Sequence, residues 1–380
     1  MRTGSTTYDA IVIGAGGMGS AAAFHLARRG QRVLVLEQFV AGHELGSSHG
    51  TSRIIRLAYF EHPDYVPLVR AAYALWEALA RDAGEILLLR TGGLDLGPPE
   101  GALVRGALEA CRVHGLPHEV YGAEEIHRRF PGLQPRPPAR GVYQPDAGML
   151  AVEKCVLAHL TLARQHGAVV HEEEPVLAVE PLAGDAVRVI TSRGSYEAAR
   201  AVVTAGPWAG RLLAELRLPL SVERQYFAFF RPRRPELFEI GRLPVFIWEL
   251  PDHHLYYGLP PCGLPGLKVA RHHGGTIVDP DTVNRRFEAE DEAGLRAFLQ
   301  ECLPEGNGEL MLGKVCLYTN TPDEDFIIDR DPRHPQVVLA AGFSGHGFKF
   351  ASVVGEILAD LAITGWTPHP IARFAISRFR

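Results

Sequence analysis

Cysteine is scarce in this sequence, and its distribution argues against two structural roles. Five cysteines occur among 380 residues, and no two of them follow the C-x-x-C spacing. Because they are widely spaced and odd in number, they argue against a disulfide framework and against a structural zinc site. Unpaired cysteines persist most easily in a reducing compartment, so we expect a cytoplasmic protein.

Long apolar runs, metal-binding spacings and an excess of basic charge are also lacking. No uncharged apolar run reaches the length of about 18 residues that indicates a membrane helix. The N-terminus has no signal-length apolar core, which indicates a mature cytoplasmic N-terminus. The 17 histidines include no H-E-x-x-H, so we predict no metal site. With 39 basic and 44 acidic residues, the net charge of −5 disfavours a nucleic-acid partner.

What the sequence does contain is a β-α-β unit at its start. Residues 8–13 are rich in β-branched and apolar side chains, which indicates a buried strand. Small and apolar residues follow at helical spacing over 16–29, and residues 32–36 predict a second strand. The chain is long enough for two to three domains, and this unit opens the first of them.

Three glycines in the turn after the first strand fit the G-x-G-x-x-G fingerprint of dinucleotide-binding folds. Gly14 allows the tight turn, Gly16 lets the backbone approach a pyrophosphate, and Gly19 lets the helix pack closely on the strand. Glu37 ends the second strand, where its carboxylate suits a ribose diol. The pattern indicates a bound dinucleotide and is common to FAD and NAD.

The rest of the chain predicts one sheet assembled from distant segments, together with a second, less regular region. Strands over 201–206 and 336–342 end in glycines, as the first strand does, and ligands of open α/β sheets lie beyond such strand ends. The further predicted elements are helices over 68–82, 101–114, 152–167, 285–303 and 348–363, a hairpin within 176–203, strands of an antiparallel sheet over 222–230 and 245–259, and a Pro- and Gly-rich loop over 131–148.

The segment GSSHGTSRIIR (46–56) concentrates polar and cationic side chains after a glycine. Its serines, histidine and arginines suit an anion clamp beside the pyrophosphate, and they are Ser47, Ser48, His49, Arg53 and Arg56. A solvated polar loop is the alternative. The chemistry of the side chains alone leaves both interpretations open.

Four motifs together make the sequence similar to a known family. GAGGMGS and GSSHGTSRIIR are joined by CLYTNTPDEDFIID (316–329) and GFSGHGFKF (342–350), and the whole resembles the monomeric sarcosine oxidase and N-methyltryptophan oxidase family of flavin-dependent amine oxidases. The resemblance runs from about residue 8 to the C-terminus. It implies an α/β, two-domain (α+β) fold of the D-amino-acid-oxidase type.

The implied fold divides the chain into two domains. A Rossmann-like FAD-binding domain is expected from three discontinuous segments, and a substrate domain with an antiparallel sheet from the remainder. The segments of the FAD-binding domain are 1–90, 150–218 and 320–380, and those of the substrate domain are 91–149 and 219–319.

The resemblance also implies a covalent cofactor. Cys316 matches the cysteine that forms a thioether with the 8α-methyl of the flavin, whereas a buried inert thiol is the usual state of a lone cysteine. Gly345, His346, Gly347 and Phe348 lead into the last predicted helix, whose N-terminal end would face the pyrimidine end of FAD. Gly345 is also expected to contact the substrate.

Catalytic and substrate-binding residues follow from the same resemblance. Lys268 matches a lysine near flavin N5, where a fixed cation would stabilise oxygen as it gains electrons. Arg56 and Lys349 match two cations that bind a substrate carboxylate. The other matches are Arg53 beside the flavin, His272 in the pocket, and the pocket residues Tyr257 and Tyr318. His273 is the alternative to His272 if the match is shifted by one residue. Trp248 and the 245–257 strand are expected to line the same region.

The implied reaction is the oxidation of a secondary amino acid by O2. Oxidative demethylation of sarcosine or another N-methyl amino acid would give formaldehyde, the amino acid and H2O2. Cyclic imino acids and glycated amino acids are alternative substrates. A flavin dehydrogenase with another acceptor, a nicotinamide enzyme and a non-catalytic flavin-carrying module are alternative functions. We expect a monomer whose partners are a small secondary amino acid and O2.

Overall fold

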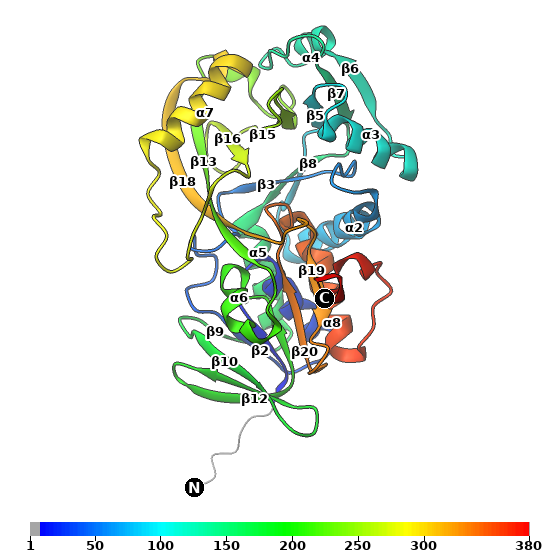
Figure 1. Cartoon of the computed structure of the whole chain (residues 1–380), viewed down its shortest axis with the longest axis vertical. Coiled ribbons are helices and arrows are strands. Elements are labelled where there is room, and N and C mark those ends of the chain that lie inside the picture. The colour runs from blue at the N-terminus through cyan, green and yellow to red at the C-terminus, as the bar shows by residue number, and fades with distance from the viewer. Residues whose placement is uncertain (1–7, 380) are drawn as a thin grey trace.

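The computed structural model describes residues 8–379, and the interpretation of the N-terminus rests partly on residues outside this range. One large sheet occupies the lower half of the molecule in Figure 1 and a second large sheet occupies the upper half, with a small three-stranded sheet between them. Within residues 8–379, no helix combines the length and the apolar character needed to cross a membrane.

The lower sheet has eight strands from distant parts of the chain. At its centre β1 (Tyr8–Ile13) runs parallel to β2 (Val33–Leu36) and to β12 (Gly194–Val203). The other strands are β9 (Val169–His171) beside β2, the antiparallel β10 (Val176–Pro181) and β11 (Val187–Thr191), and β20 (Val337–Ala341), which pairs with β12 and with β19 (Ile327–Arg330). The predicted assembly of one sheet from distant segments is therefore confirmed.

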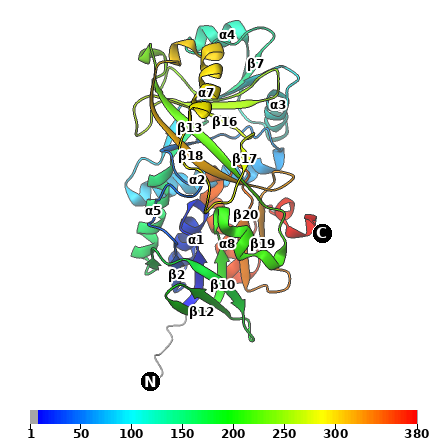
Figure 2. The ribbon, with the colours of Figure 1, turned by 60° about the vertical axis from the view of Figure 1, so that its left-hand side comes forward.

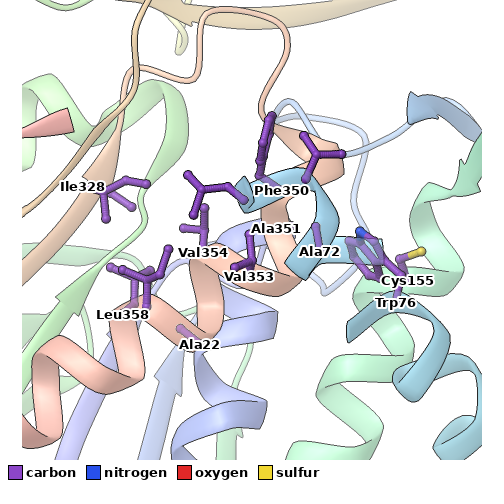
Figure 3. Close-up of a cluster of buried hydrophobic side chains, with 14 of the residues drawn as sticks. Ala22, Ala72, Trp76, Cys155, Ile328, Phe350, Ala351, Val353, Val354 and Leu358 are labelled. Atoms are coloured by element: carbon purple, nitrogen blue, oxygen red, sulfur yellow. The ribbon is translucent and has the colours of Figure 1, made fainter. Parts of the chain in front are cut away.

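Four helices pack together beside this sheet and build the main apolar core. They are α1 (Gly17–Arg28), α2 (Val66–Ala83), α5 (Val152–Gln165) and α8 (Ala351–Thr364). Figure 3 shows how Trp76 of α2, Cys155 of α5 and Leu358 of α8 contribute to this core. Because the core fixes α1 and α8 against each other, it fixes the turns that lead into both helices.

The upper sheet has nine strands, in the order β17, β13, β16, β15, β14, β5, β7 and β6, with β18 also paired to β13. Their bounds are β5 Gly93–Gly97, β6 Glu119–Gly122, β7 Arg140–Gln144, β13 Ser221–Arg231, β14 Val245–Glu249, β15 Leu255–Leu259, β16 Leu267–His272, β17 Thr276–Ile277 and β18 Glu309–Asn320. Figure 2 shows the long β13 and β18 side by side. Since β14 pairs with β5 in parallel, this sheet is mixed rather than purely antiparallel.

Short elements complete the upper half and the boundary between the sheets. The helices are α3 (Ala102–His114), α4 (Ala123–Arg129) and α7 (Ala289–Cys302), and α6 (Ala209–Leu212) follows β12 in the lower half. The small middle sheet contains β3 (Ser52–Ile55), β8 (Gly148–Ala151) and β4 (Leu88–Arg90). It carries part of the 46–56 segment between the two large sheets.

The prediction of a loop over 131–148 is wrong in its second half. This stretch contains β7 and the start of β8, although its Pro and Gly content is typical of loops. Tertiary pairing overrides that local preference, because β7 pairs with both β5 and β6. The division of the chain into domains at residues 90, 149, 218 and 319 stays a prediction.

Candidate active site

The turn between β1 and α1 uses its glycines in two different ways. Gly14 has φ +91°, and a Cβ there would lie 2.6 Å from the carbonyl oxygen of Thr204. A Cβ on Gly19 would overlap the carbonyl oxygen of Gly14. A Cβ on Gly16 would meet only Ser48 Oγ, at 3.5 Å, which is ordinary contact. The packing of the protein itself requires glycine at 14 and 19, whereas Gly16 keeps open a space that faces a cavity.

Glu37 closes the same turn from the end of β2. Its carboxylate accepts hydrogen bonds from the backbone N–H of Ala15 at 2.7 Å and of Phe39 at 2.9 Å, and His43 Nε2 lies 3.4 Å away. The side chain is buried and lines the cavity. This fixed acidic group lies where the sequence predicts a contact to ribose hydroxyls.

A cavity of about 460 Å³ runs along these elements. Its lining joins the glycine turn, the 46–48 segment, the end of β12, the strand β18 and the loop that leads to α8. The predicted site residues among its lining are Gly14, Gly16, Glu37, Ser47, Ser48, Arg53, Tyr318, Gly345, Gly347 and Phe348. Segments far apart in sequence therefore converge on one cavity, which we call the first cavity.

The 46–56 segment is held by hydrogen bonds that orient it toward the first cavity. Ser48 Oγ accepts a hydrogen bond from the backbone N–H of Gly17 at 3.0 Å, and Ser47 Oγ donates to the carbonyl of Leu317 at 2.6 Å. Arg53 donates to the carbonyl of Ser47 at 3.0 Å. The alternative of a solvated loop does not fit these contacts.

His49, in the same segment, is fully buried and lines neither this cavity nor the smaller one described next. Burial, and after it the positive charge of Arg53, lowers the pKa of His49 to about 3.

A second, smaller cavity of about 70 Å³ adjoins the first. The two share lining residues from β3, β18 and the loop before α8, namely Arg53, Tyr318, Gly345 and Phe348. The other predicted site residues that line the second cavity are Arg56, Tyr257, His272, His346 and Lys349. A molecule in the second cavity would therefore lie beside one in the first.

Arg56 is a buried cation on this second cavity. Its Nη2 lies 2.8 Å from Glu61 Oε2, its Nη1 donates to the carbonyl of Ala58 at 2.7 Å, and Asp95 lies 3.9 Å from its Nε. Burial opposes the charge, but Glu61 and Asp95 outweigh it, so the pKa of Arg56 lies above its usual value. The guanidinium therefore keeps its charge while it is almost out of contact with water.

Lys349 and Asp95 are buried ionisable groups whose charges depend on pH near neutrality. Lys349 Nζ donates to the carbonyl of His346 at 2.7 Å and to the hydroxyl of Tyr59 at 3.4 Å. Burial and the nearby Arg56 lower the pKa of Lys349 to about 7. Burial raises the pKa of Asp95 to about 7, against the attraction of Arg56. Both groups therefore titrate in the physiological range.

The histidines and tyrosines of the second cavity are neutral hydrogen-bonding groups. The ring of His346 contacts the Tyr59 hydroxyl through Nδ1 at 2.5 Å and the carbonyl of Glu324 through Nε2 at 3.0 Å, and burial lowers its pKa to about 4. His272 Nδ1 lies 3.3 Å from the Tyr318 hydroxyl, and burial holds the pKa of His272 well below its usual value. Burial raises the pKa of Tyr257 to about 12.

Lys268 and Cys316 lie behind the cavities rather than on their surfaces. Lys268 Nζ donates to the carbonyls of Gly50 at 2.6 Å and Ser52 at 2.8 Å, and lies 4.5 Å from the centre of the Phe227 ring. Burial, and after it the positive charge of Arg53, holds the pKa of Lys268 well below its usual value. Cys316 is buried in the same apolar cluster as Phe227, and neither Lys268 nor Cys316 lines the first or the second cavity.

Several residues of the two cavities were missed by the sequence analysis. Thr204, Trp208 and Asp281 line the first cavity, and Phe60 and Glu61 line the second. From the 245–257 strand, which was expected there, the residue that lines the second cavity beside Tyr257 is Ile247. Trp248 does not line either cavity but packs on Phe298 in the upper core, with ring centroids 5.9 Å apart. Alternate side chains of a strand point to opposite faces, so Ile247 takes the place expected for Trp248. Among these missed residues, only Glu61 could have been found from the sequence, because its negative charge lies five residues after Arg56.

Among the residues that the structure describes, no group of three or more His, Cys, Asp or Glu side chains is arranged to hold a metal ion. The adjacent residues His272 and His273 have different hydrogen-bond partners, because His272 Nδ1 lies 3.3 Å from the Tyr318 hydroxyl and His273 Nδ1 lies 3.3 Å from Glu223 Oε2. His272 is the one of the two that lines the second cavity.

A dinucleotide-binding turn on one cavity, with buried cations on an adjoining smaller cavity, fits an enzyme that holds a dinucleotide beside a small anionic ligand, and the comparison of sequences identifies the class. The FAD dependent oxidoreductase family matches residues 9–361, and the chain belongs to this family. Nearly the whole described chain is therefore part of one FAD-dependent oxidoreductase.

Individual relatives narrow the class. The chain is 45% identical to the monomeric sarcosine oxidase of Streptomyces avermitilis, with 97% of both chains covered. It is 36% identical to the N-methyl-L-tryptophan oxidase of Yersinia pestis, with 98% of this chain and 100% of the relative covered. Among solved structures it resembles NikD, an unusual amino acid oxidase essential for nikkomycin biosynthesis, with a TM-score of 0.86, 29% identity and 97% of both chains covered. The predicted family resemblance is confirmed.

The residues of the first cavity suit FAD. The open space at Gly16 admits a pyrophosphate close to the backbone, the N-terminus of α1 offers N–H donors, and Glu37 offers a carboxylate for ribose hydroxyls. Thr319 also lines this cavity, and its buried Oγ1 has no hydrogen-bond partner within the described chain, so a polar ligand would satisfy it.

The contrast between the glycines of the turn generates a prediction about cofactor binding. We expect Gly16→Ala to fold normally but to purify with less than about half of the native flavin, because its methyl group would occupy space that the protein leaves open for the pyrophosphate. Flavin absorbance per chain and the far-ultraviolet circular dichroism spectrum measure the two properties.

Gly122→Ala is the matched control, since a Cβ there meets no atom within 4 Å. It should change neither property. Native flavin content in Gly16→Ala would contradict this role for the turn.

Proposed function

We propose that this protein is an FAD-dependent oxidase of sarcosine and related small N-methyl amino acids. It would use O2 and release formaldehyde, the demethylated amino acid and H2O2. One observation carries the proposal: a small cavity with the buried cations Arg56 and Lys349 adjoins the cavity that suits FAD. The names of the relatives in Streptomyces and Yersinia support the same reaction class.

Arg56 and Lys349 would bind the substrate carboxylate. In this cavity Glu61 already neutralises part of the positive charge by pairing with Arg56. A substrate carboxylate would compete with Glu61 for the guanidinium, and hydrogen bonds between charged partners contribute about 1.5–3 kcal/mol each. The two cations would thus orient the amino acid by one end and leave its amine free to face the first cavity.

Neutral groups and neighbouring cations would favour the uncharged form of the substrate amine. His272 and Tyr318, whose ring nitrogen and hydroxyl lie 3.3 Å apart, are uncharged near neutral pH and line the second cavity. Arg56 and Arg53 disfavour an added ammonium charge there. Bound FAD supplies the two-electron oxidation of the C–N bond and passes the electrons to O2. The resulting imine would hydrolyse in water.

Lys268 is the residue proposed to favour O2 as the acceptor. Its Nζ donates to two backbone carbonyls near Arg53, and the resemblance assigns it to oxygen reduction. The alternative of a dehydrogenase with another acceptor shares every other feature of the site. Cyclic imino acids and glycated amino acids also carry a carboxylate beside a secondary amine, and the small second cavity favours the smallest substrates among these classes.

We further propose that FAD is attached through Cys316. The thiol lies on β18 immediately before Leu317 and Tyr318, both of which line the first cavity. Burial raises the pKa of Cys316, and the positive charges of Arg53 and Lys268 oppose that rise. These cations would help form the thiolate that a thioether requires.

A monomer in the cytoplasm is the proposed state of the protein. The relatives from Streptomyces and Bacillus are named monomeric sarcosine oxidases. All five cysteines are free in the structure, as a reducing compartment favours.

A direct test of the reaction separates the oxidase from its alternatives. Sarcosine should bleach the flavin absorbance of the purified protein without oxygen, and in air it should yield H2O2 and formaldehyde in equal amounts. A non-catalytic flavin carrier would not bleach.

Lys268→Met should lower the rate of reoxidation by O2 at least about tenfold, because it removes the fixed cation, while anaerobic bleaching persists. Equal reoxidation rates in the variant would favour a different role for Lys268.

The buried cations generate a prediction about pH. Lys349 loses its positive charge and Asp95 gains a negative charge as the pH rises through about 7. We therefore expect acetate, a carboxylate without an amine, to inhibit about tenfold more weakly at about pH 8 than at about pH 6, as the protonated fraction of Lys349 falls. The competitive inhibition constant measures this change. The Lys349→Met variant should bind acetate weakly, and its inhibition constant should change less with pH. If the inhibition constant of the native protein is the same at about pH 6 and about pH 8, the proposed binding of the carboxylate by Arg56 and Lys349 is refuted.

Covalent attachment of the cofactor has its own measurement. Acid precipitation should leave the native pellet yellow, whereas Cys316→Ser should release its flavin to the supernatant, because serine lacks the nucleophilic sulfur. Cys302→Ser is the matched control, since Cys302 is a buried cysteine of the upper core. A yellow pellet from Cys316→Ser would show that another residue holds the flavin.

A further inference from the structure

The second cavity is small for a substrate site. It has a volume of about 70 Å³. The first cavity, by comparison, has a volume of about 460 Å³. Sarcosine has three carbons, one nitrogen and two oxygens, whereas a benzyl group on its α-carbon would add seven carbons. The side chains that enclose the cavity therefore matter for the choice of substrate.

One side of the cavity is a face of the upper sheet. Asp95 of β5, Ile247 of β14 and Tyr257 of β15 are directly opposite one another in the strand register. Side chains in such positions point to the same face of a sheet. Ile247 and Tyr257 line the second cavity, and Asp95 Oδ1 lies 3.9 Å from Arg56 Nε. Ile247 is thus a fixed apolar contact on the sheet side of the cavity.

Phe60 encloses the cavity from the loop that follows β3. Its ring centroid lies 4.7 Å from the Arg56 guanidinium carbon, and the Tyr59 ring lies 4.6 Å from the same carbon. Arg56 is proposed to hold the substrate carboxylate, and the α-carbon is bonded to that group. Phe60 is therefore within reach of any substituent on the α-carbon.

The backbone of Phe60 has little freedom to move away from the cavity. It packs against Gly106 of α3 so closely that a Cβ on Gly106 would overlap the carbonyl oxygen of Phe60. On the other side Tyr59 is held through its hydroxyl by His346 at 2.5 Å. A larger substrate would thus have to displace a ring whose backbone is fixed from both directions.

From these contacts we propose that Phe60 and Ile247 are the specificity-determining residues that restrict the substrate to N-methyl amino acids with a small α-substituent. This inference rests on the proposed function and assigns its substrate range to two side chains. Phe60 has a second effect, because its ring also packs on Arg56 and helps to orient the guanidinium.

The test compares sarcosine with N-methyl-L-phenylalanine as substrates of the holoenzyme. Phe60→Ala should raise kcat/KM for N-methyl-L-phenylalanine about tenfold or more, because it removes the steric block. It should lower kcat/KM for sarcosine about two- to fivefold through the lost packing on Arg56. Ile247→Ala should raise the ratio of kcat/KM for the bulky substrate to kcat/KM for sarcosine about threefold or more, because it also removes a steric block. It therefore tests the proposal even if Phe60→Ala does not fold.

Phe130→Ala is the matched control, because Phe130 is a half-buried phenylalanine that packs on Tyr143 and lines neither cavity. It should leave the ratio of the two kcat/KM values unchanged. The proposal is overturned if both cavity variants fold and keep the native ratio within about twofold, or if the native enzyme accepts the bulky substrate as readily as sarcosine. In either case, oxidation of sarcosine by the native enzyme would still support the proposed function. If no N-methyl amino acid reduces the flavin of the native protein, both the proposed function and the proposed specificity are wrong.

Discussion

The buried positive charge of Arg56 is the constraint on which the candidate site depends. A guanidinium is always protonated in a protein, so out of water it needs anions and carbonyl oxygens as partners. Glu61, Asp95 and the carbonyl of Ala58 supply them. Leaving such a charge without one partner costs about 3–5 kcal/mol. Because Asp95 comes from the upper sheet and Arg56 follows β3 of the middle sheet, this pairing also links two parts of the fold.

The adjacency of the two cavities follows from where the large sheets meet. The lower sheet brings the glycine turn and the end of β20 to one edge, and the long strand β18 reaches the same place from the upper sheet. Tyr318 of β18 and Gly345 of the loop before α8 line both cavities. A Cβ on Gly345 would overlap the Tyr318 ring, so the loop approaches β18 as closely as a backbone can. Redox chemistry between neighbouring ligands requires such an arrangement.

Much of the fold could be predicted because local patterns and tertiary structure agree. The β-α-β opening and the hairpin within 176–203 appear as the periodicity indicates. The stretch 131–148 was misassigned, since β7 forms only by pairing with two neighbours distant in sequence. Trp248 was placed in the pocket for a related reason: which face of a strand meets the cavity depends on register, and one residue reverses the outcome.

The sequence by itself determined the dinucleotide turn, the family and the chemical types available to the site, because glycine spacing and charge are properties of the chain alone. The tertiary structure alone decided which groups meet. It paired Arg56 with Asp95, placed Lys268 and Cys316 behind the cavity surfaces, and closed the second cavity with Phe60. These outcomes depend on burial and on contacts between distant segments, which set pKa values and cavity size and leave no local trace in the order of the residues.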